Sequence, residues 1–456
     1  MIRSAGPVLL ALSALLVGCA PAPNATTAPT GLPIVEASPT AASPGVSTFS
    51  PAPIPSPLES PLASPVGLPA FTTPVPPGAG TAWSGIHWRK LATDDPLAHV
   101  RSVVRWRGGF VALGAVIASG QTSSTPLWVS ADGVSWRPLD PGVLGPATVV
   151  IGVAETATGI VALTLHGGAN QCDGQTTPLD CWALTPPLQA WTSSDATSWT
   201  SHPEPGIALP SGCDGCGVDV PTLRSGTPGL LMVNHNGGTE RVGARAAVSR
   251  DGVAWENVPA DAFPSGFAIG DVAGFRSGFI AVGDNPGALG NTGGGETVRA
   301  VALSSPDGRH WVTRDLPTAG LDPQAGSTAN RIVVGPAGLI ATGSDGLAPG
   351  TELWWSSVSG STWSRLKGYP PLGVWTGQGQ GSGMMPNGTL LGDGERMLAY
   401  RGGDKPVAWT SSDGRSWRTI AIGGSRPTGS GTLVLMPIGV LWIGDDGSTW
   451  FGQPAT

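Results

Sequence analysis

The chain has 456 residues, of which 69 are glycine and 18 are tryptophan, and only 12% carry a charge. Its formal net charge is −7, and its 24 lysines and arginines are scattered. Because binding to phosphates requires clustered cations, this composition excludes a nucleic-acid groove. Many short apolar runs bounded by glycine predict an all-β domain with a large core.

Residues 1–18 are expected to be a secretory signal peptide. One cation, Arg3, precedes an apolar run that ends in the letters LVGC at Cys19. A small-residue cleavage site directly before a cysteine resembles the bacterial lipobox, in which the cysteine is acylated. The alternative is an ordinary signal peptide followed by a chance cysteine. The apolar run is shorter than the ~20 residues of a spanning helix. We therefore expect an extracytoplasmic protein that is anchored by lipid at Cys19 to a bacterial cell membrane.

Residues 19–80 are expected to form a disordered linker. Proline, alanine, serine and threonine dominate this stretch, and charged and aromatic residues are nearly absent from it. Such a composition cannot bury enough apolar surface to offset chain entropy. This composition predicts a tether that holds the folded domain, residues 81–456, away from the membrane.

The folded domain contains a repeated phrase, Ser-x-Asp-Gly-x-x-Trp. Its copies end at Trp136, Trp199, Trp255, Trp311, Trp363 and Trp417, with spacings of 63, 56, 56, 52 and 54 residues. A glycine-led apolar run such as GGFVALG (108–114) or SGFIAVG (277–283) precedes most copies. Each unit therefore predicts four antiparallel strands, which is the content of one propeller blade.

The ends of the domain predict a closed ring of seven blades. The segment TAWSGIHWRKLA (81–92) looks like the tail of a unit without a beginning, and 438–453 looks like a unit without an outer strand. Joining the two would remove an exposed sheet edge. Two details stay open: LWIGDDGSTW also aligns with the repeated phrase, and either GTLLGDG or RMLAYRG could be the second strand of the sixth blade.

The phrase resembles the Asp-box of sialidase-like propellers, also called the bacterial neuraminidase repeat. Glycine tolerates positive φ and aspartate can accept hydrogen bonds from the next backbone N–H groups, so the phrase suits a turn between a blade's third and fourth strands. The carboxylates concerned are Asp132, Asp195, Asp251, Asp307 and Asp413. The resemblance implies that these turns are structural and lie on the face opposite the active site.

The four cysteines after Cys19 are expected to form disulfides, because an even number is typical of exported proteins. They are Cys172, Cys181, Cys213 and Cys216. Pairing within each loop is favoured over pairing between loops, and the alternatives are a zinc or redox role for Cys213 and Cys216. The long loop at 166–187 and the connection at 211–219 would present ligand candidates on the other face of the disc: His166, Asp173, Asp180 and Asp214.

No catalytic group is evident. Sialidases use a tyrosine nucleophile and three arginines, but only Tyr369 and Tyr400 exist here, and Arg105 and Arg107 have no clear position. No metal or cofactor motif is present. The sequence therefore predicts a monomeric binding or scaffold propeller that recognises a protein or a surface glycan; the alternative is a glycoside hydrolase acting through the central funnel.

Overall fold

The computed structural model describes the greater part of the domain. The described residues are 83–92, 100–119, 122–131, 133, 135–140, 142–170, 182–202, 221–234, 245–286, 298–318, 326–345, 352–366, 389–402, 405–425, 427–428, 431–436, 438–444, 446 and 448–455. All of them belong to one compact unit, residues 67–456. The predicted signal peptide, Cys19 and the linker lie outside the described residues.

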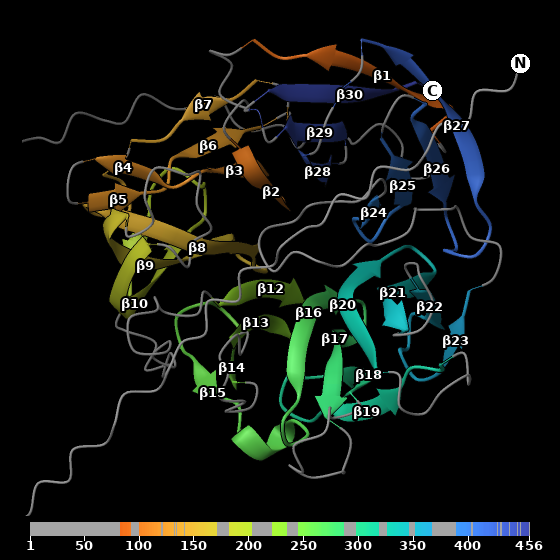
Figure 1. The fold of residues 1–456 in the computed structure, drawn as a ribbon. Coiled ribbons are helices and arrows are strands. Elements are labelled where there is room, and N and C mark those ends of the chain that lie inside the picture. The colour runs from red at the N-terminus through yellow and green to blue at the C-terminus, as the bar shows by residue number, and fades with distance from the viewer. Residues whose placement is uncertain are drawn as a thin grey trace, which may run out of the picture. The chain divides into compact units, whose positions relative to one another are not determined.

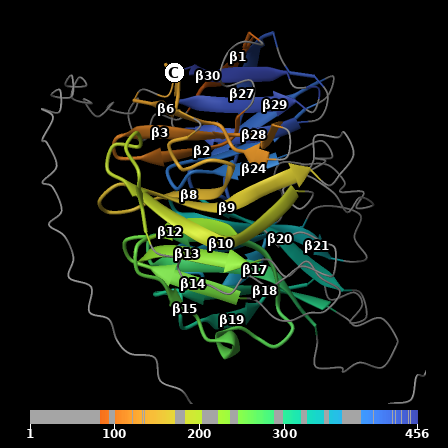
Figure 2. The ribbon, with the colours of Figure 1, turned by 90° about the vertical axis from the view of Figure 1, so that its left-hand side faces the viewer.

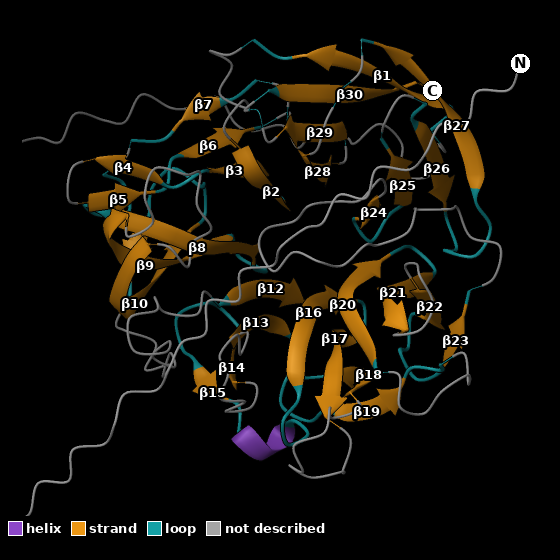
Figure 3. Cartoon of the chain, viewed as in Figure 1, coloured by secondary structure: helices purple, strands orange, loops and turns teal. Residues whose placement is uncertain are grey.

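The all-β prediction is confirmed. The described residues form four-stranded sheets, and their one helical segment is the 3₁₀ turn η3 (Ala260–Ala262), which is purple in Figure 3. None of the described helical structure is long and apolar enough to cross a bilayer.

Five sheets have four strands each, with strands paired in chain order. They are β2 (Val100–Trp106), β3 (Gly109–Gly114), β6 (Leu127–Ser130) and β7 (Arg137–Pro138); β8 (Thr148–Glu155), β9 (Ile160–Asn170), β10 (Trp182–Ser193) and β11 (Thr200–Ser201); β12 (Thr222–Gly226), β13 (Gly229–Asn234), β14 (Arg245–Ser249) and β15 (Glu256–Asn257); β16 (Ala268–Phe275), β17 (Gly278–Pro286), β18 (Val298–Ser305) and β19 (Val312–Asp315); and β20 (Ser327–Val334), β21 (Gly338–Asp345), β22 (Glu352–Ser357) and β23 (Trp363–Arg365). A short ribbon, β4 (Ile117–Ser119) with β5 (Thr122–Ser124), follows β3.

The remaining strands form one eight-stranded sheet that contains two four-strand units. The first unit is β24 (Thr389–Gly392), β25 (Met397–Arg401), β26 (Val407–Ser411) and β27 (Arg418–Gly424); the second is β28 (Gly431–Met436), β29 (Gly439–Gly444), β30 (Thr449–Ala455) and β1 (Gly85–Lys90). We call each four-strand unit a blade and name it by its first strand. In the β28 blade the outer strand is β1, which pairs antiparallel with β30 from Gly85↔Ala455 to Lys90↔Trp450.

The two units fuse because β27 is longer than the outer strands of the other blades. Its first residues pair with β26, and Ala421–Gly424 then pair in parallel with Gly85–Trp88 of β1. The sequence predicted separate four-stranded blades and did not anticipate this junction.

The two registers left open by the sequence are resolved. GTLLGDG supplies the first strand β24, and RMLAYRG supplies the second strand β25. The Asp-Asp-Gly turn near Asp446 joins β29 to β30, the second and third strands of its blade, so it does not occupy the position of the repeated phrase.

The core consists of apolar layers between consecutive blades. One layer packs Leu231 and Val248 of the β12 blade against Phe279 of the β16 blade, and another packs Val100 of β2 against Met436 and Phe451 of the β28 blade. Figure 1 shows the blades following one another, with each first strand nearest to a common centre, and Figure 2 shows the same blades from the side. This architecture is a β-propeller, in which side chains on both faces of every sheet are buried against neighbours.

Candidate functional site

The repeated phrase forms the turn between the third and fourth strands of a blade. Asp251 Oδ1 accepts hydrogen bonds from the backbone N–H groups of Val253 (2.8 Å) and Ala254 (3.1 Å) and from the hydroxyl of Ser249 (3.2 Å). The Gly252 N–H donates to the same Ser249 hydroxyl at 2.8 Å. Asp195, Asp307 and Asp413 bind their turns in a corresponding way.

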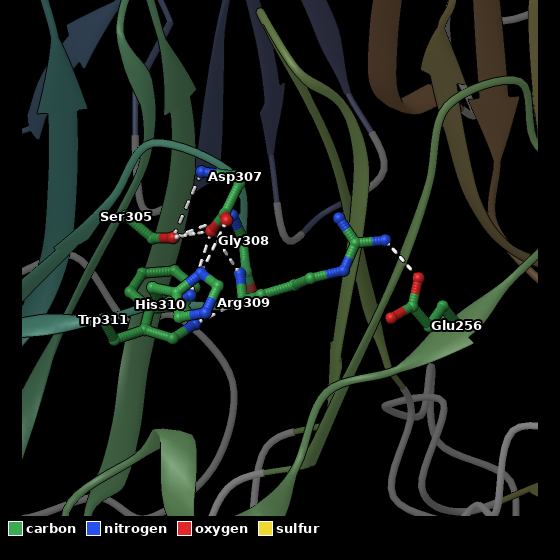
Figure 4. A network of polar contacts seen from close by, with 7 residues as sticks. All are labelled: Glu256, Ser305, Asp307, Gly308, Arg309, His310 and Trp311. Atoms are coloured by element: carbon green, nitrogen blue, oxygen red, sulfur yellow. Dashed lines mark hydrogen bonds and ion pairs between the residues drawn. The ribbon is translucent and has the colours of Figure 1, made fainter.

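Figure 4 shows the copy at Asp307, which is also linked to the preceding blade. Asp307 Oδ1 accepts from the N–H groups of Arg309 (2.8 Å) and His310 (2.9 Å), while its Oδ2 lies 2.7 Å from Nδ1 of His310. The Arg309 guanidinium forms an ion pair with Glu256 of β15. The carboxylate of Asp307 is thus bound by its own turn, while the side chain of Arg309 reaches the β12 blade.

Hydrogen bonding controls the ionisation of these turn carboxyls. Partial burial acts to raise the pKa of each one, but the backbone and side-chain hydrogen bonds of the turn together outweigh burial, so the pKa values of Asp195, Asp251, Asp307 and Asp413 are lowered. A carboxylate that is held ionised by its own turn has a structural task and is a poor proton donor.

Each phrase tryptophan packs between blades. The indole N–H of Trp255 donates to the Gly252 carbonyl at 3.0 Å, and its ring packs against the layer between the β8 and β12 blades. The same hydrogen bond recurs at Trp136, Trp311, Trp363 and Trp417. The ring therefore secures the turn and covers the core with one side chain.

Two copies depart from the phrase and keep the turn. Ser359 replaces aspartate, and its hydroxyl lies 2.8 Å from those of Ser357 and Ser361. Ala196 replaces glycine and adopts the left-handed φ of +58°. In the first copy, Asp132 lies outside the described residues, although the Gly133 N–H still donates to the Ser130 hydroxyl at 2.7 Å.

The candidate site is a central cavity of about 600 Å³. The first strand of every blade contributes to its wall, namely β2, β8, β12, β16, β20, β24 and β28. Most lining side chains are aliphatic or glycine, and the charged ones are Arg224, Asp271, Arg331 and Asp393. The volume falls within the range of small-ligand sites.

Three of these charges come from consecutive blades. Arg224 of β12 donates from Nε to the Val272 carbonyl at 2.9 Å, and its Nη2 lies 3.5 Å from Asp271 Oδ1. Asp271 of β16 also accepts from its neighbour's N–H, that of Val272 (2.8 Å), and from the Ile332 N–H of β20 (3.1 Å). Asp271 therefore bridges the edges of two blades and binds one of the arginines.

Arg331 is the third member of this cluster and is held differently. It projects from β20 into the cavity, and within the described part of the chain its guanidinium forms no hydrogen bond or ion pair. The enclosing protein lowers the pKa of Arg331; the Asp271 charge opposes this effect and the Arg224 charge adds to it. The side chain remains accessible to the solvent of the cavity. The cluster of two arginines and one aspartate carries an uncompensated positive charge.

A second group of charges lies at the end of the first strands where the hairpins to the second strands begin, which we call the hairpin side. Arg105 of the β2 blade and Glu395 of the β24 blade form an ion pair of 2.9 Å beside a smaller cavity of about 230 Å³. Asp393, in the hairpin after β24, accepts from the N–H groups of Glu395 (2.9 Å) and Arg396 (2.8 Å). Burial raises the pKa of Asp393, and the nearby Arg396 charge opposes that rise.

Glu155 belongs to the same hairpin side. Burial raises the pKa of Glu155. A hydrogen bond of 3.0 Å from the Arg107 backbone N–H and the nearby charges of Arg105 and Arg107 act in the opposite direction. These contacts join the β2 and β8 blades. The sequence had left the positions of Arg105 and Arg107 open, and both prove to lie at the hairpin side of the cavity.

Few of the predicted ligand residues can be placed. His166 is exposed and lies in β9, opposite Thr148 and Thr185, so the predicted 166–187 loop is partly wrong: β9 and β10 extend into it because they continue to pair. Asp173, Asp180, Asp214 and the cysteines Cys172, Cys181, Cys213 and Cys216 lie outside the described residues, as does Tyr369.

Tyr400 is unsuited to nucleophilic attack. Its side chain is 1% exposed and packs edge-on between Trp88 and Trp442, with ring centroids at 5.8 and 6.1 Å. No group of three or more potential metal ligands occurs among the described residues.

The four cavity charges were not predicted, because the first strands read in the sequence as short β runs without a distinctive motif. A signal was present. Asp271 stands seven positions before Gly278, and Arg331 stands seven positions before Gly338, the glycines that begin the second strands. The alignment of the repeats on these glycines places both charged residues at one register of the inner wall.

The fold and the cavity define the chain as a β-propeller with a charged central site. No family model matches the chain, and no curated relative matches it. Similar solved structures include a GH74 xyloglucanase from Xanthomonas campestris, with 16% identity over 80% of this chain and 53% of that chain and a TM-score of 0.38. The phi92 phage endosialidase has 12% identity over 82% of this chain and 70% of that chain, with a TM-score of 0.35.

A puromycin hydrolase shows 14% identity over 75% of this chain and 50% of its own, with a TM-score of 0.42. These similar structures are thus glycoside hydrolases and another hydrolase. The chain spans about half the length of the xyloglucanase and of the puromycin hydrolase. Identities this low carry no information about a substrate.

Proposed function

We propose that this chain is a seven-bladed, sialidase-like propeller that binds a protein or a surface glycan at its central cavity. The observation that supports this proposal is that the first strands of all the four-strand units line one cavity. Among the described residues, Arg331 of this cavity has no hydrogen-bond or ion-pair partner. The N–H donors of its guanidinium are therefore available to a ligand.

The ring is proposed to be closed by β1, and its turns to be Asp-boxes. The pairing of β1 with β30 and the layer between the β28 and β2 blades support closure. The recurring carboxylate and indole hydrogen bonds support the Asp-box reading. We further propose that lipid on Cys19 and the 19–80 linker hold the propeller, as a monomer, outside the bacterial membrane.

Binding is tested by filling the cavity. The full chain, Ala273→Phe and Ala254→Phe would be applied to arrays of surface glycans and to immobilised extracytoplasmic proteins of the host. Ala273 lines the cavity, while Ala254 is exposed on a turn. Saturable binding that is lost only in Ala273→Phe is expected. Equal binding by both variants would contradict a cavity site.

The second candidate is a glycoside hydrolase, favoured by one observation. Asp271 and Asp393 line the same cavity, and burial raises the pKa of Asp393, as is common for a catalytic acid. Fluorogenic glycosides decide between the two functions. Turnover that disappears in Asp393→Asn, with the fold retained, would replace the binding function by hydrolysis.

The lipid anchor is tested separately. Growth of the host with an alkyne-bearing fatty acid should label the full chain and leave Cys19→Ala unlabelled. Labelling of the Cys19→Ala chain would show that the lipid is attached to another residue. Absence of label from both would exclude lipidation by that acid.

A further inference from the structure

The smaller cavity of about 230 Å³ adjoins the central cavity on the hairpin side. The two cavities have four lining residues in common, namely Val103, Gly392, Asp393 and Leu435. The rest of the wall of the smaller cavity consists of Arg105, Phe110 and Met436. The smaller cavity therefore lies between the central cavity and the hairpins that follow β2 and β24.

An ion pair lies beside the smaller cavity and joins blades that are not consecutive. Arg105 Nη1 of the β2 blade is 2.9 Å from Glu395 Oε1 of the β24 blade. The β28 blade stands between these two blades, because one apolar layer packs it against the β2 blade and another packs it against the β24 blade. From β28 itself, only the apolar Leu435 and Met436 line the smaller cavity. The ion pair thus reaches past the intervening blade.

The two halves of this ion pair are held to different degrees. Glu395 Oε2 also lies 3.5 Å from Arg396 Nη2, and the Glu395 N–H donates to Asp393 at 2.9 Å. Among the described residues, the Arg105 side chain forms no other hydrogen bond or ion pair, and it is 44% exposed. Arg105 is therefore the half of the pair that is free to move.

Glu155 of the β8 blade offers the Arg105 guanidinium a second acceptor. The Arg105 charge already acts on Glu155, where it opposes the rise in pKa that burial causes. One oxygen of Glu155 accepts the Arg107 N–H at 3.0 Å, and within the described part of the chain the other forms no hydrogen bond. Arg105 thus stands between a carboxylate across the smaller cavity and a carboxylate on the next blade.

We propose that Arg105 is a movable strap across a second opening of the central cavity, on the hairpin side. Paired with Glu395, the side chain closes this opening; turned towards Glu155, it leaves the opening free. Either position places the guanidinium beside one carboxylate, and a partly exposed ion pair is weak, so the two positions exchange. The inference goes beyond the proposed function, since it does not depend on what the cavity binds.

The test places a reporter thiol in the wall that both cavities share. The full chain with Val103→Cys is treated with uncharged methyl methanethiosulfonate at low ionic strength, and mass spectrometry measures the label on residue 103. Adding Glu395→Gln should raise the labelling rate about two- to fivefold, the range that the loss of an exposed ion pair allows. Adding Glu155→Gln should lower the rate about twofold, because Arg105 loses its second acceptor.

Three controls distinguish a strap from a general loosening of the fold. Glu256→Gln removes the carboxylate of another partly exposed ion pair, on the outer strand β15, and should leave the Val103→Cys rate unchanged. Ala273→Cys lies in the wall of the central cavity alone, so its rate should respond less to Glu395→Gln. High salt should bring the Val103→Cys rate to that of the variant with Glu395→Gln, which should itself change little.

The proposal is overturned if Glu395→Gln leaves the Val103→Cys rate unchanged, if Glu256→Gln raises the rate as much, or if Glu155→Gln raises it. Absence of label from residue 103 in every variant would also refute a second opening. Circular dichroism establishes that each variant is folded, and Leu435→Cys, in the same shared wall, replaces Val103→Cys if that variant fails to fold. None of these results bears on the proposed binding function, which the Ala273→Phe variant decides.

Discussion

At the scale of single residues, the turn aspartates act on the backbone that surrounds them. Asp251 accepts three hydrogen bonds within its own turn, and Ser359 shows that a hydroxyl can occupy the same place. Each turn between a third and a fourth strand leaves the same backbone N–H groups without a strand partner. The same acceptor is therefore needed in every blade, which explains why the phrase is repeated.

Asp251→Ala should lower the free energy of unfolding by about 1–2 kcal/mol, because turn N–H groups lose their acceptor. Asp251→Ser should cost less, as the natural Ser359 turn suggests. Urea unfolding at neutral pH measures both. Equal losses would show that the carboxylate has no advantage over a hydroxyl, and equal stabilities would show that the turn needs no acceptor.

Glycine at the next position is needed for space as well as for its backbone conformation. Gly252 has a φ of +81°, and an added Cβ would lie 2.2 Å from Val161 of the β8 blade; Gly394 has a φ of +80° with open space around it. Gly252→Ala should cost about 2–4 kcal/mol, from the left-handed conformation plus overpacking, and Gly394→Ala only about 1–2. Thermal unfolding compares them. If Gly394→Ala lowered the stability as much as Gly252→Ala, the loss would come entirely from the left-handed backbone conformation and not from overpacking.

Buried carboxyls and turn carboxyls should give opposite pH dependences. Burial raises the folded-state pKa of Asp393, so its contribution to stability is present below its unfolded pKa of about 3.9 and is lost as pH rises through the folded value. The lowered pKa of Asp413 makes a contribution that is present above that unfolded pKa and is lost on acidification.

Asp393→Asn should therefore flatten the decline of stability from about pH 4 towards neutrality, whereas Asp413→Asn should weaken the loss of stability in acid. Unfolding free energies measured across this range for both variants and the unaltered chain provide the check. An unchanged profile in Asp393→Asn would mean that Asp393 titrates alike in the folded and unfolded chains.

At the scale of elements, β1 is the strand on which the sheet of the last two blades depends. It pairs with β30 on one side and β27 on the other, and its Trp88 is 1% exposed against Tyr400. Removing it would leave the edges of β27 and β30 unpaired, and such edges template aggregation.

Trp88→Ala should cost about 3–5 kcal/mol, as expected for a buried tryptophan in a packed core. Trp450→Ala, on β30 and only half-buried, is the matched control and should cost less. Thermal unfolding and light scattering on heating give the comparison. If Trp450→Ala were the more damaging change, the anchoring role would belong to β30 and not to β1.

At the scale of the whole propeller, the arrangement of the blades brings together residues that are far apart in the chain. Arg105 and Glu395 are separated by 290 positions, yet their side chains form an ion pair at 2.9 Å. The pair is partly exposed and sensitive to salt, so its worth to stability is about 0–1 kcal/mol. Its significance lies in position: it joins two blades that are not consecutive, at the hairpin side of the cavity.

The sequence by itself determined the all-β class, the repeating units and the turns, because these depend on local chemistry. A glycine that tolerates positive φ, an aspartate that binds the next N–H groups and a tryptophan that covers a core have the same effect wherever they occur. GGFVALG became a second strand for the same reason: its glycine turns the hairpin and its apolar residues are buried.

Only the tertiary structure decided which residues form the site. Arg224, Asp271 and Arg331 are single charged residues in three first strands, and nothing near each one in sequence marks it as part of a cluster. The fusion of two blades through β27 and the burial of Tyr400 were equally hidden. In each case the decisive contact joins distant segments, and its energy depends on which strands the packing of the blades brings together.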